Sequence, residues 1–140
     1  MKKTTQINPY LFFQGQCEAA FRCYEQCLGG HIDARHTYAE APEPDQNPPG
    51  MDDKIMHIRL AVGDWVLMGS DSPADYYQAP QGFAVSLVFD EPAEAERVFN
   101  TLATDGSVTM PLAETFWADR FGMLVDRFGI PWMINCEKSG

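Results

Sequence analysis

Apolar and polar positions along the first half of the chain predict a strand, a helix and three further strands. Residues 7–13 form a short apolar and aromatic run, which indicates a strand. Apolar residues then recur every three or four positions through residues 17–28, the spacing of an amphipathic helix, and Gly29-Gly30 supplies its stop. Residues 31–38 form a weaker strand pattern. Residues 54–63 and 64–71 predict two strands that meet at a tight Gly63-Asp64 turn.

The same order begins again at residue 83. Residues 83–89 predict a strand, and residues 90–106 predict a helix that Asp90 caps and that has Pro92 in its first turn. Residues 107–117, 120–129 and 131–137 are three more strand candidates. A shift of 76 residues places Leu11 on Leu87 and Gly30 on Gly106. Two such modules predict an α+β fold in which they are paired, because either sheet alone would expose an apolar face.

Residues 54–63 have the clearest strand pattern of the chain, because two different faces alternate along them. One face is apolar and consists of Met56, Ile58, Leu60 and Val62. His57 and Arg59 lie on the other face. We therefore expect a helix to cover the first face and the polar pair to line a site on the second.

The segment from residue 40 to residue 53 interrupts this pattern. It contains four prolines, five acidic residues and one glycine among 14 residues. Such a composition predicts an exposed loop without regular structure. A loop of this length in a compact domain is often functional, and a lid over a binding site is one interpretation.

Composition and charge exclude several classes of partner. The formal net charge is −10, with 20 acidic against 10 basic residues, and this charge repels nucleic acid and anionic membranes. No apolar run is long enough to span a membrane, and the first residues lack the pattern of a signal peptide. We expect a cytoplasmic protein whose ligand is a small molecule.

Four cysteines, Cys17, Cys23, Cys27 and Cys136, do not form a C-x-x-C motif. Cys23 and Cys27 share one helix face and could contribute half of a metal site. The favoured interpretation is that the cysteines are small buried apolar residues in a reducing compartment.

Several motifs resemble one known superfamily over essentially the whole chain. The segments INPYLFF, CYEQCLGG, MHIRLAVGDWVLMGSD and ETFWADRFGMLVDRFGIPWMIN are similar to the vicinal oxygen chelate superfamily of glyoxalases, extradiol dioxygenases and bleomycin-resistance proteins, and within it to the PhnB-like branch. The resemblance implies one domain over residues 1–140. Two βαβββ modules, about residues 5–72 and 82–138, would form an eight-stranded cup with helices outside, a site inside and a homodimeric assembly.

Glyoxalase-type relatives hold a divalent ion with four His or Glu side chains. Matching by motif places these four positions at Pro9, Met68, Phe83 and Met133. None is a normal ligand for such an ion, since thioethers suit only soft ions such as Cu(I). We therefore expect neither a metal nor another cofactor. The methyltransferase label often given to the PhnB-like branch also lacks support, because no glycine-rich loop follows a strand.

An apolar cup with a few polar groups is the composition of a small-molecule site. Pro9, Met68, Phe83 and Met133 would form its walls, and His57, Arg59 and Asn135 its polar groups. His57 could act as an acid or base, and Arg59 could hold a carboxylate or phosphate. Alternatively, His57 is a structural residue and Arg59 pairs with an acid such as Asp126.

The segment ETFWADRFG, residues 114–122, is the most family-specific stretch of the chain. Trp117 could close the site as an aromatic wall, and Glu114 is the best-placed carboxylate for a general base or a cationic ligand. Alternatively, Trp117 packs at the dimer interface, and Asp119 with Arg120 forms an exposed turn pair.

Three hypotheses for the function follow. The first is a metal-independent small-molecule-binding protein with an apolar pocket. The second is an enzyme of the lyase, isomerase or dioxygenase type that acts on a small polar metabolite, with His57 or Glu114 as base. The third is a structural or interaction module whose pocket is filled by its own side chains.

Overall fold

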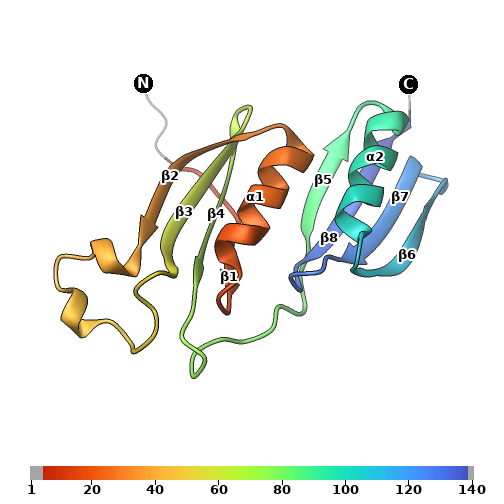
Figure 1. Ribbon diagram of the computed structural model, residues 1–140. Helices are drawn as coiled ribbons and strands as arrows, with labels where there is room; N and C mark the ends of the chain where they lie inside the picture. Colours follow the sequence, from red (N-terminus) through yellow and green to blue (C-terminus); the bar gives the residue numbers. More distant parts are fainter. Residues whose placement is uncertain (1–4, 139–140) are drawn as a thin grey trace. The chain divides into compact units, whose positions relative to one another are not determined.

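A computed structural model describes residues 5–138, and the chain divides into two compact units, Met1–Gln78 and Ala79–Gly140. Each unit contains one four-stranded sheet and one long helix (Figure 1). The predicted order of strand, helix and three strands therefore occurs twice. Within residues 5–138, no helix has both the length and the apolar character needed to cross a membrane.

The first unit builds its sheet in the order β1-β4-β3-β2, with β1 parallel to β4 and the other pairs antiparallel. Its elements are β1 (Tyr10–Phe13), α1 (Cys17–Leu28), β2 (His31–Thr37), the 3-10 helices η1 (Tyr38–Glu40) and η2 (Pro44–Gln46), β3 (Ile55–Val62) and β4 (Trp65–Asp71).

The second unit repeats this arrangement in the order β5-β8-β7-β6, again with the first strand parallel to the last. Its elements are β5 (Val85–Phe89), α2 (Pro92–Ala103), β6 (Ser107–Ala113), β7 (Ala118–Val125) and β8 (Pro131–Glu137). The edge strand β6 is almost entirely exposed, and two register shifts interrupt its pairing with β7.

One face of each sheet is packed against the helix of the same unit. In the first unit Ile58 and Leu60 of β3 are fully buried, as the alternation of residues 54–63 predicted. Gly69 of β4 lets the Phe21 ring of α1 approach the sheet, since an added Cβ would lie 2.7 Å from that ring. In the second unit Gly122 plays the same part, with an added Cβ 2.8 Å from the Phe99 ring of α2.

The buried carboxylate of Asp71, at the end of β4, binds three backbone N–H groups. Oδ1 accepts hydrogen bonds from Gly15 (2.8 Å) and Cys17 (3.0 Å), and Oδ2 accepts one from Ile55 (2.9 Å). One side chain thus joins the N-terminal end of α1, the beginning of β3 and the end of β4.

Asp126 is the buried carboxylate of the second unit. Its Oδ1 accepts hydrogen bonds from the backbone of Phe128 (2.8 Å) and Ile130 (3.0 Å), and its Oδ2 accepts one from the Trp132 indole (2.8 Å). The turn between β7 and β8 is therefore closed around a charged group whose hydrogen-bonding needs are met locally.

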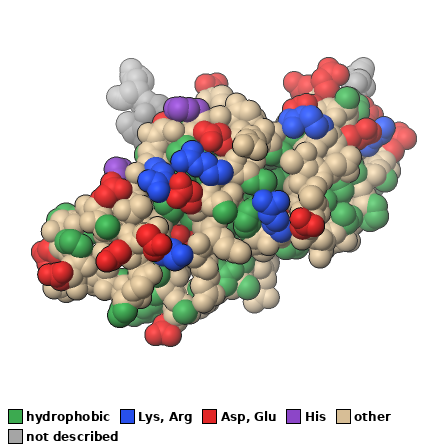
Figure 2. Space-filling model, in the orientation of Figure 1, with side chains coloured by type: hydrophobic (Ala, Val, Ile, Leu, Met, Phe, Trp, Pro, Cys, Tyr) green, Lys and Arg blue, Asp and Glu red, His purple; other side chains and the backbone are tan. Residues whose placement is uncertain are grey.

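Several element boundaries differ from the sequence prediction. Helix α2 has Glu91 rather than Asp90 at its N-cap position, with no capping bond from the side chain. The strand predicted over residues 107–117 ends at Ala113, and β7 begins at Ala118. The acidic loop is also more ordered than predicted, because η1 and η2 lie within residues 38–46 and Asn47 donates a hydrogen bond to the Tyr38 carbonyl. Figure 2 shows acidic side chains over this loop.

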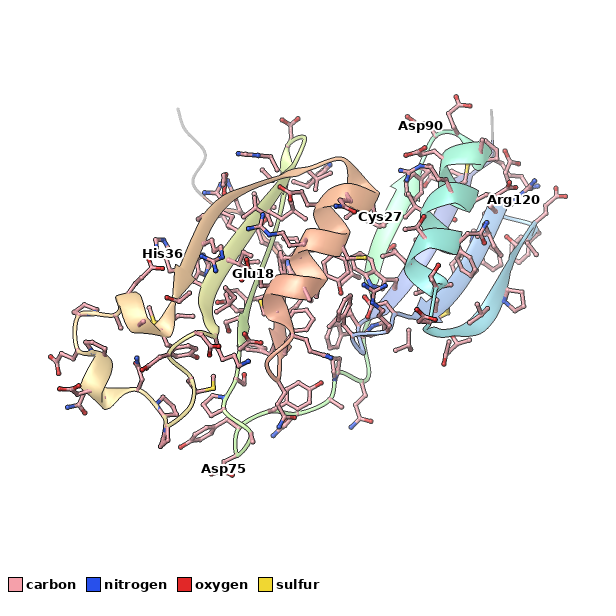
Figure 3. The ribbon with its side chains drawn as sticks, viewed as in Figure 1. Glu18, Cys27, His36, Asp75, Asp90 and Arg120 are labelled. Atoms are coloured by element: carbon pink, nitrogen blue, oxygen red, sulfur yellow. The ribbon has the colours of Figure 1, made fainter. Side chains whose placement is uncertain are left out.

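We predict that Asp71→Ala lowers the free energy of unfolding by about 3–5 kcal/mol, because it leaves two buried N–H groups and one part-buried N–H group without an acceptor. Urea denaturation followed by circular dichroism measures this loss. Asp75→Ala is the matched control, since Asp75 is exposed in the loop after β4 (Figure 3) and its removal should cost less than about 0.5 kcal/mol. Equal losses for the two variants would contradict this structural role.

Candidate functional site

Each sheet has a second face, opposite its helix, and we call it the open face. The alternation of side chains along the strands determines its members. The open face of the first sheet comprises Tyr10, Phe12, His57, Arg59, Met68 and Ser70, and that of the second comprises Ser86, Val88, Phe121, Met123, Met133 and Asn135.

Strand register identifies the residues beside the two methionines. Tyr10 of β1 is the Cα partner of Met68, and the Pro9 carbonyl accepts the Met68 N–H at 3.1 Å. In the second sheet the partner of Met133 is Ser86. Phe83, which the motif match placed in this position, precedes β5 and is 56% exposed.

The donors at these positions do not suit a divalent ion of the glyoxalase type. Each sheet offers one thioether and one hydroxyl there, whereas such an ion needs imidazole or carboxylate ligands. Across residues 5–138, no three or more His, Cys, Asp or Glu side chains are grouped so that they could hold a metal ion.

His57 lies beside an aromatic residue that the sequence analysis did not select. The Tyr10 hydroxyl is 3.1 Å from His57 Nδ1, and the two rings stack with their centroids 5.8 Å apart. The available signal was the alternation in β1, where buried Leu11 and Phe13 leave Tyr10 and Phe12 on the open face. The pairing itself could not be found this way, because β4 separates β1 from β3 in the sheet.

Arg59 has an acidic neighbour in its own sheet. Its Nε is 3.7 Å from the Asp33 carboxylate of β2, and both side chains are partly exposed. The partner suggested from sequence, Asp126, instead accepts the hydrogen bonds of its own turn described above. Arg59 therefore keeps a loosely held, solvent-accessible guanidinium.

Three aromatic rings form a cluster at the β6–β7 connection. Trp117 contacts Phe121 with ring centroids 5.3 Å apart and Phe116 with centroids 4.9 Å apart. The Thr115 hydroxyl accepts the N–H groups of Trp117 (3.3 Å) and Ala118 (3.1 Å), which fixes the connection locally. Trp117 is 47% exposed and Phe116 90%, so much of this aromatic surface is available for binding.

Asn135 adds a polar group to the second open face. Its Cα partners are Val88 of β5 and Phe121 of β7, so apolar side chains flank it on both sides. The Asn135 Oδ1 is buried and, among the described residues, has no hydrogen-bond donor. Burial without a partner destabilises a polar atom, which makes this amide a candidate ligand contact.

The remaining charged residues of segment 114–122 have structural partners. Glu114 is exposed and accepts a 2.7 Å hydrogen bond from Lys138, whose charge holds the pKa of Glu114 below its usual range. A carboxylate with a lowered pKa is a weak general base at neutral pH. The turn pair expected from Asp119 and Arg120 is wrong, because both residues lie in β7 and Arg120 pairs with Glu96 of α2 at 2.8 Å. Figure 3 shows Arg120 on the α2 side of the unit.

The cysteines match the apolar interpretation. Cys17, Cys27 and Cys136 are buried, and Cys23 is half-buried. Burial, together with the nearby charge of Asp71, raises the pKa of the Cys17 thiol far above its usual range. This thiol is therefore protonated and unreactive at neutral pH.

Comparison with known proteins places the chain among related sequences. Residues 6–134 match the family model described as the Glyoxalase/Bleomycin resistance protein/Dioxygenase superfamily. Protein YjdN of Escherichia coli (strain K12) is 34% identical over 141 residues, covering 95% of this chain and 96% of its own length.

Two solved structures share the fold. Protein PA1353 from Pseudomonas aeruginosa is 50% identical with a TM-score of 0.89, covering 97% of this chain and 100% of that one. A Bacillus cereus PhnB protein, described as a putative 3-demethylubiquinone-9 3-methyltransferase, is 25% identical with a TM-score of 0.78, covering 94% and 99%. The predicted α+β fold of two βαβββ modules is confirmed.

We predict that Lys138→Met raises the pKa of Glu114, because the ammonium that stabilises its ionised form is removed. Because the pKa of Glu114 is lowered in the folded protein, the ion pair stabilises the fold at pH values above the unfolded-state pKa. This contribution to the free energy of unfolding disappears as the pH falls through the lowered pKa. Carboxyl carbon NMR titration measures the shift. Glu43, exposed in the acidic loop, is the control carboxylate whose titration should not change. An unchanged Glu114 titration would contradict the ion pair.

Proposed function

Because the chain belongs to the Glyoxalase/Bleomycin resistance protein/Dioxygenase superfamily, we propose that it uses this scaffold to bind a small organic molecule without a divalent metal ion. The binding surface is the open face of the second sheet together with Trp117. The observation that carries the proposal is the partly exposed aromatic cluster of Trp117 and Phe121 beside the buried, unsatisfied Asn135 Oδ1.

Donor chemistry supports the metal-independent part of this proposal. Met68 and Met133, two of the four positions matched by motif, are thioethers, and their strand partners Tyr10 and Ser86 add a phenol and a hydroxyl. Replacing the water shell of a borderline divalent ion with these groups would lose more coordination energy than it gains. Binding must then rely on aromatic contact, apolar burial and hydrogen bonding.

Local rigidity supports the choice of the aromatic cluster. The Thr115 bonds hold the β6–β7 connection before a ligand arrives, so less side-chain and backbone freedom is lost on binding. Tryptophan and phenylalanine faces also provide a large contact area for planar ligands. Met133 and Met123, on the same face, are deformable side chains that can adapt to ligand shape.

The proposed setting is a homodimer in the cytoplasm. The superfamily resemblance supports a dimer, and the net charge of −10 favours a small-molecule ligand over nucleic acid or an anionic membrane. Gel filtration with light scattering would determine the oligomeric state.

A second candidate function is an enzyme that uses the open face of the first sheet. The observation that favours it is the 3.1 Å contact between Tyr10 and His57, which fixes the imidazole in one orientation. With Nδ1–H donating to the Tyr10 oxygen, Nε2 carries the lone pair and can accept a proton from a substrate. Arg59, held only loosely by Asp33, can bind an anionic substrate group.

The binding function predicts that 1-methylindole, a planar probe, binds the purified protein with a dissociation constant on the order of 1 mM. Ligand-observed NMR should give the same affinity before and after treatment with a chelator. Trp117→Leu should weaken binding roughly tenfold, since it removes the central ring of the cluster.

Trp65→Leu is the matched control for this experiment. Trp65 is also exposed, at 77%, but it lies at the turn between β3 and β4, so its replacement should leave binding unchanged. Loss of binding with chelator, together with stoichiometric zinc, nickel or iron by elemental analysis, would contradict metal independence. Absence of any binding would favour the structural or interaction module.

The second candidate has its own test on a panel of small polar metabolites. For any substrate that the protein turns over, His57→Gln should lower kcat/KM by roughly 100-fold or more, because it removes the proton acceptor. Tyr10→Phe should produce a smaller loss, and His31→Gln, at the exposed start of β2, should have no effect. An unchanged rate for His57→Gln would exclude His57 as the base.

A further inference from the structure

We infer that Asn135 selects the class of ligand: a planar molecule whose ring N–H, amide N–H or hydroxyl donates a hydrogen bond to Asn135 Oδ1 while its apolar part lies against Phe121 and Trp117. This inference rests on the proposed binding function and specifies the ligand of the same surface. Aromatic contact alone would not require the ligand to carry a hydrogen-bond donor.

The alternation of side chains along β8 determines the direction in which the Asn135 side chain points. In β8 the residues Trp132, Ile134 and Cys136 are buried, and Gly122, the partner of Ile134, is packed against Phe99 of α2. Asn135 alternates with these residues and so points away from the helix. Its amide therefore belongs to the same face as Phe121.

Among the described residues, none donates a hydrogen bond to the amide oxygen of Asn135. The partner residues on the two adjacent strands, Val88 and Phe121, carry no polar side-chain atom, and neither does Met133 on the same strand. Strand β8 is an inner strand that pairs with both β5 and β7, so its own backbone N–H groups take part in the sheet. The described residues therefore leave Oδ1 as the one buried side-chain oxygen or nitrogen without a hydrogen bond.

In the first sheet, the position equivalent to Asn135 is occupied by Ser70. Ser70 follows Met68 at the same interval at which Asn135 follows Met133. A hydroxyl rotates freely and serves as both donor and acceptor, so it adapts to many neighbours. In the orientation that the structure shows, the Asn135 amide has its oxygen as the unsatisfied atom, and this oxygen accepts hydrogen bonds only, so the second open face favours ligands that donate one.

Access to the oxygen requires a side-chain movement, and the neighbouring residues allow it. Val88 and Phe121 each keep part of their surface exposed, so a change of rotamer in either one uncovers Oδ1. The donor group of the ligand then lies beside Oδ1, in the place that the apolar side chain of Val88 or Phe121 has left. A ligand without a donor would leave the oxygen buried and unsatisfied, which is the physical basis of discrimination.

The experiment compares indole with 1-methylindole, two planar probes that differ in one N–H donor. For the wild type we expect indole to bind roughly tenfold more tightly by ligand-observed NMR, because only indole can satisfy Oδ1. In Asn135→Leu the ratio of the two dissociation constants should fall to about one. Asn135→Asp keeps an acceptor oxygen and should retain the preference for indole.

A second measurement tests the unsatisfied oxygen itself. Asn135→Leu replaces the amide with an apolar group of similar shape, so the unfolding midpoint of the free protein should rise by a few degrees. Asn100→Leu, at an exposed position of α2, is the control and should change neither the midpoint nor the indole preference.

Three results would overturn the inference. Equal affinity of the wild type for the two probes would remove the role of Asn135 and leave the proposed binding function intact. A lower unfolding midpoint of Asn135→Leu would show that Oδ1 has a partner in the native protein. Failure of both probes to bind would reject the inference together with the binding function on which it rests.

Discussion

The fold of the first unit depends on one buried carboxylate. Asp71 accepts hydrogen bonds from Gly15, Cys17 and Ile55, which belong to two segments that are far apart in the sequence. These bonds fix where α1 begins and where β3 begins relative to the end of β4. Helix and sheet then pack at the short separation that Gly69 permits. This arrangement also sets the geometry of the open face, because Asp71 joins the strands that carry His57 and Met68, and β1, which carries Tyr10, pairs with β4.

Sequence periodicity was sufficient to predict the eight strands and two long helices of the described residues, but not η1, η2 or the end of β6. The alternation from Met56 to Val62 identified the face beneath the helix, because a strand with one covered face has apolar residues at every second position. Contacts that depend on strand register could not be predicted in this way. Tyr10 reaches His57 across an intervening strand, and Ser86 rather than Phe83 lies beside Met133, and only the pairing of strands reveals either fact. Charged pairs such as Arg120–Glu96 leave even less signal, because many acids are available to each arginine.

The two open faces show how one repeated scaffold can carry two kinds of chemistry. Equivalent strand positions hold His57 and Arg59 in the first sheet, but Phe121 and Met123 in the second. The first face therefore carries an imidazole and a guanidinium, and the second has aromatic rings, thioethers and one amide. The two units thus share one strand arrangement but differ in the side chains on their open faces.

Strand β6 has a consequence for the behaviour of the protein in concentrated solution. An exposed edge strand without a charged residue would ordinarily pair with the edge of another chain and start aggregation. Pro111 removes one backbone donor from this edge, and the register shifts around Met110 prevent a continuous row of hydrogen-bonding groups. Pro111 and the irregular pairing thus make β6 a poor template for a further strand, and a straightened β6 with Pro111 replaced by a β-branched residue would be a better one.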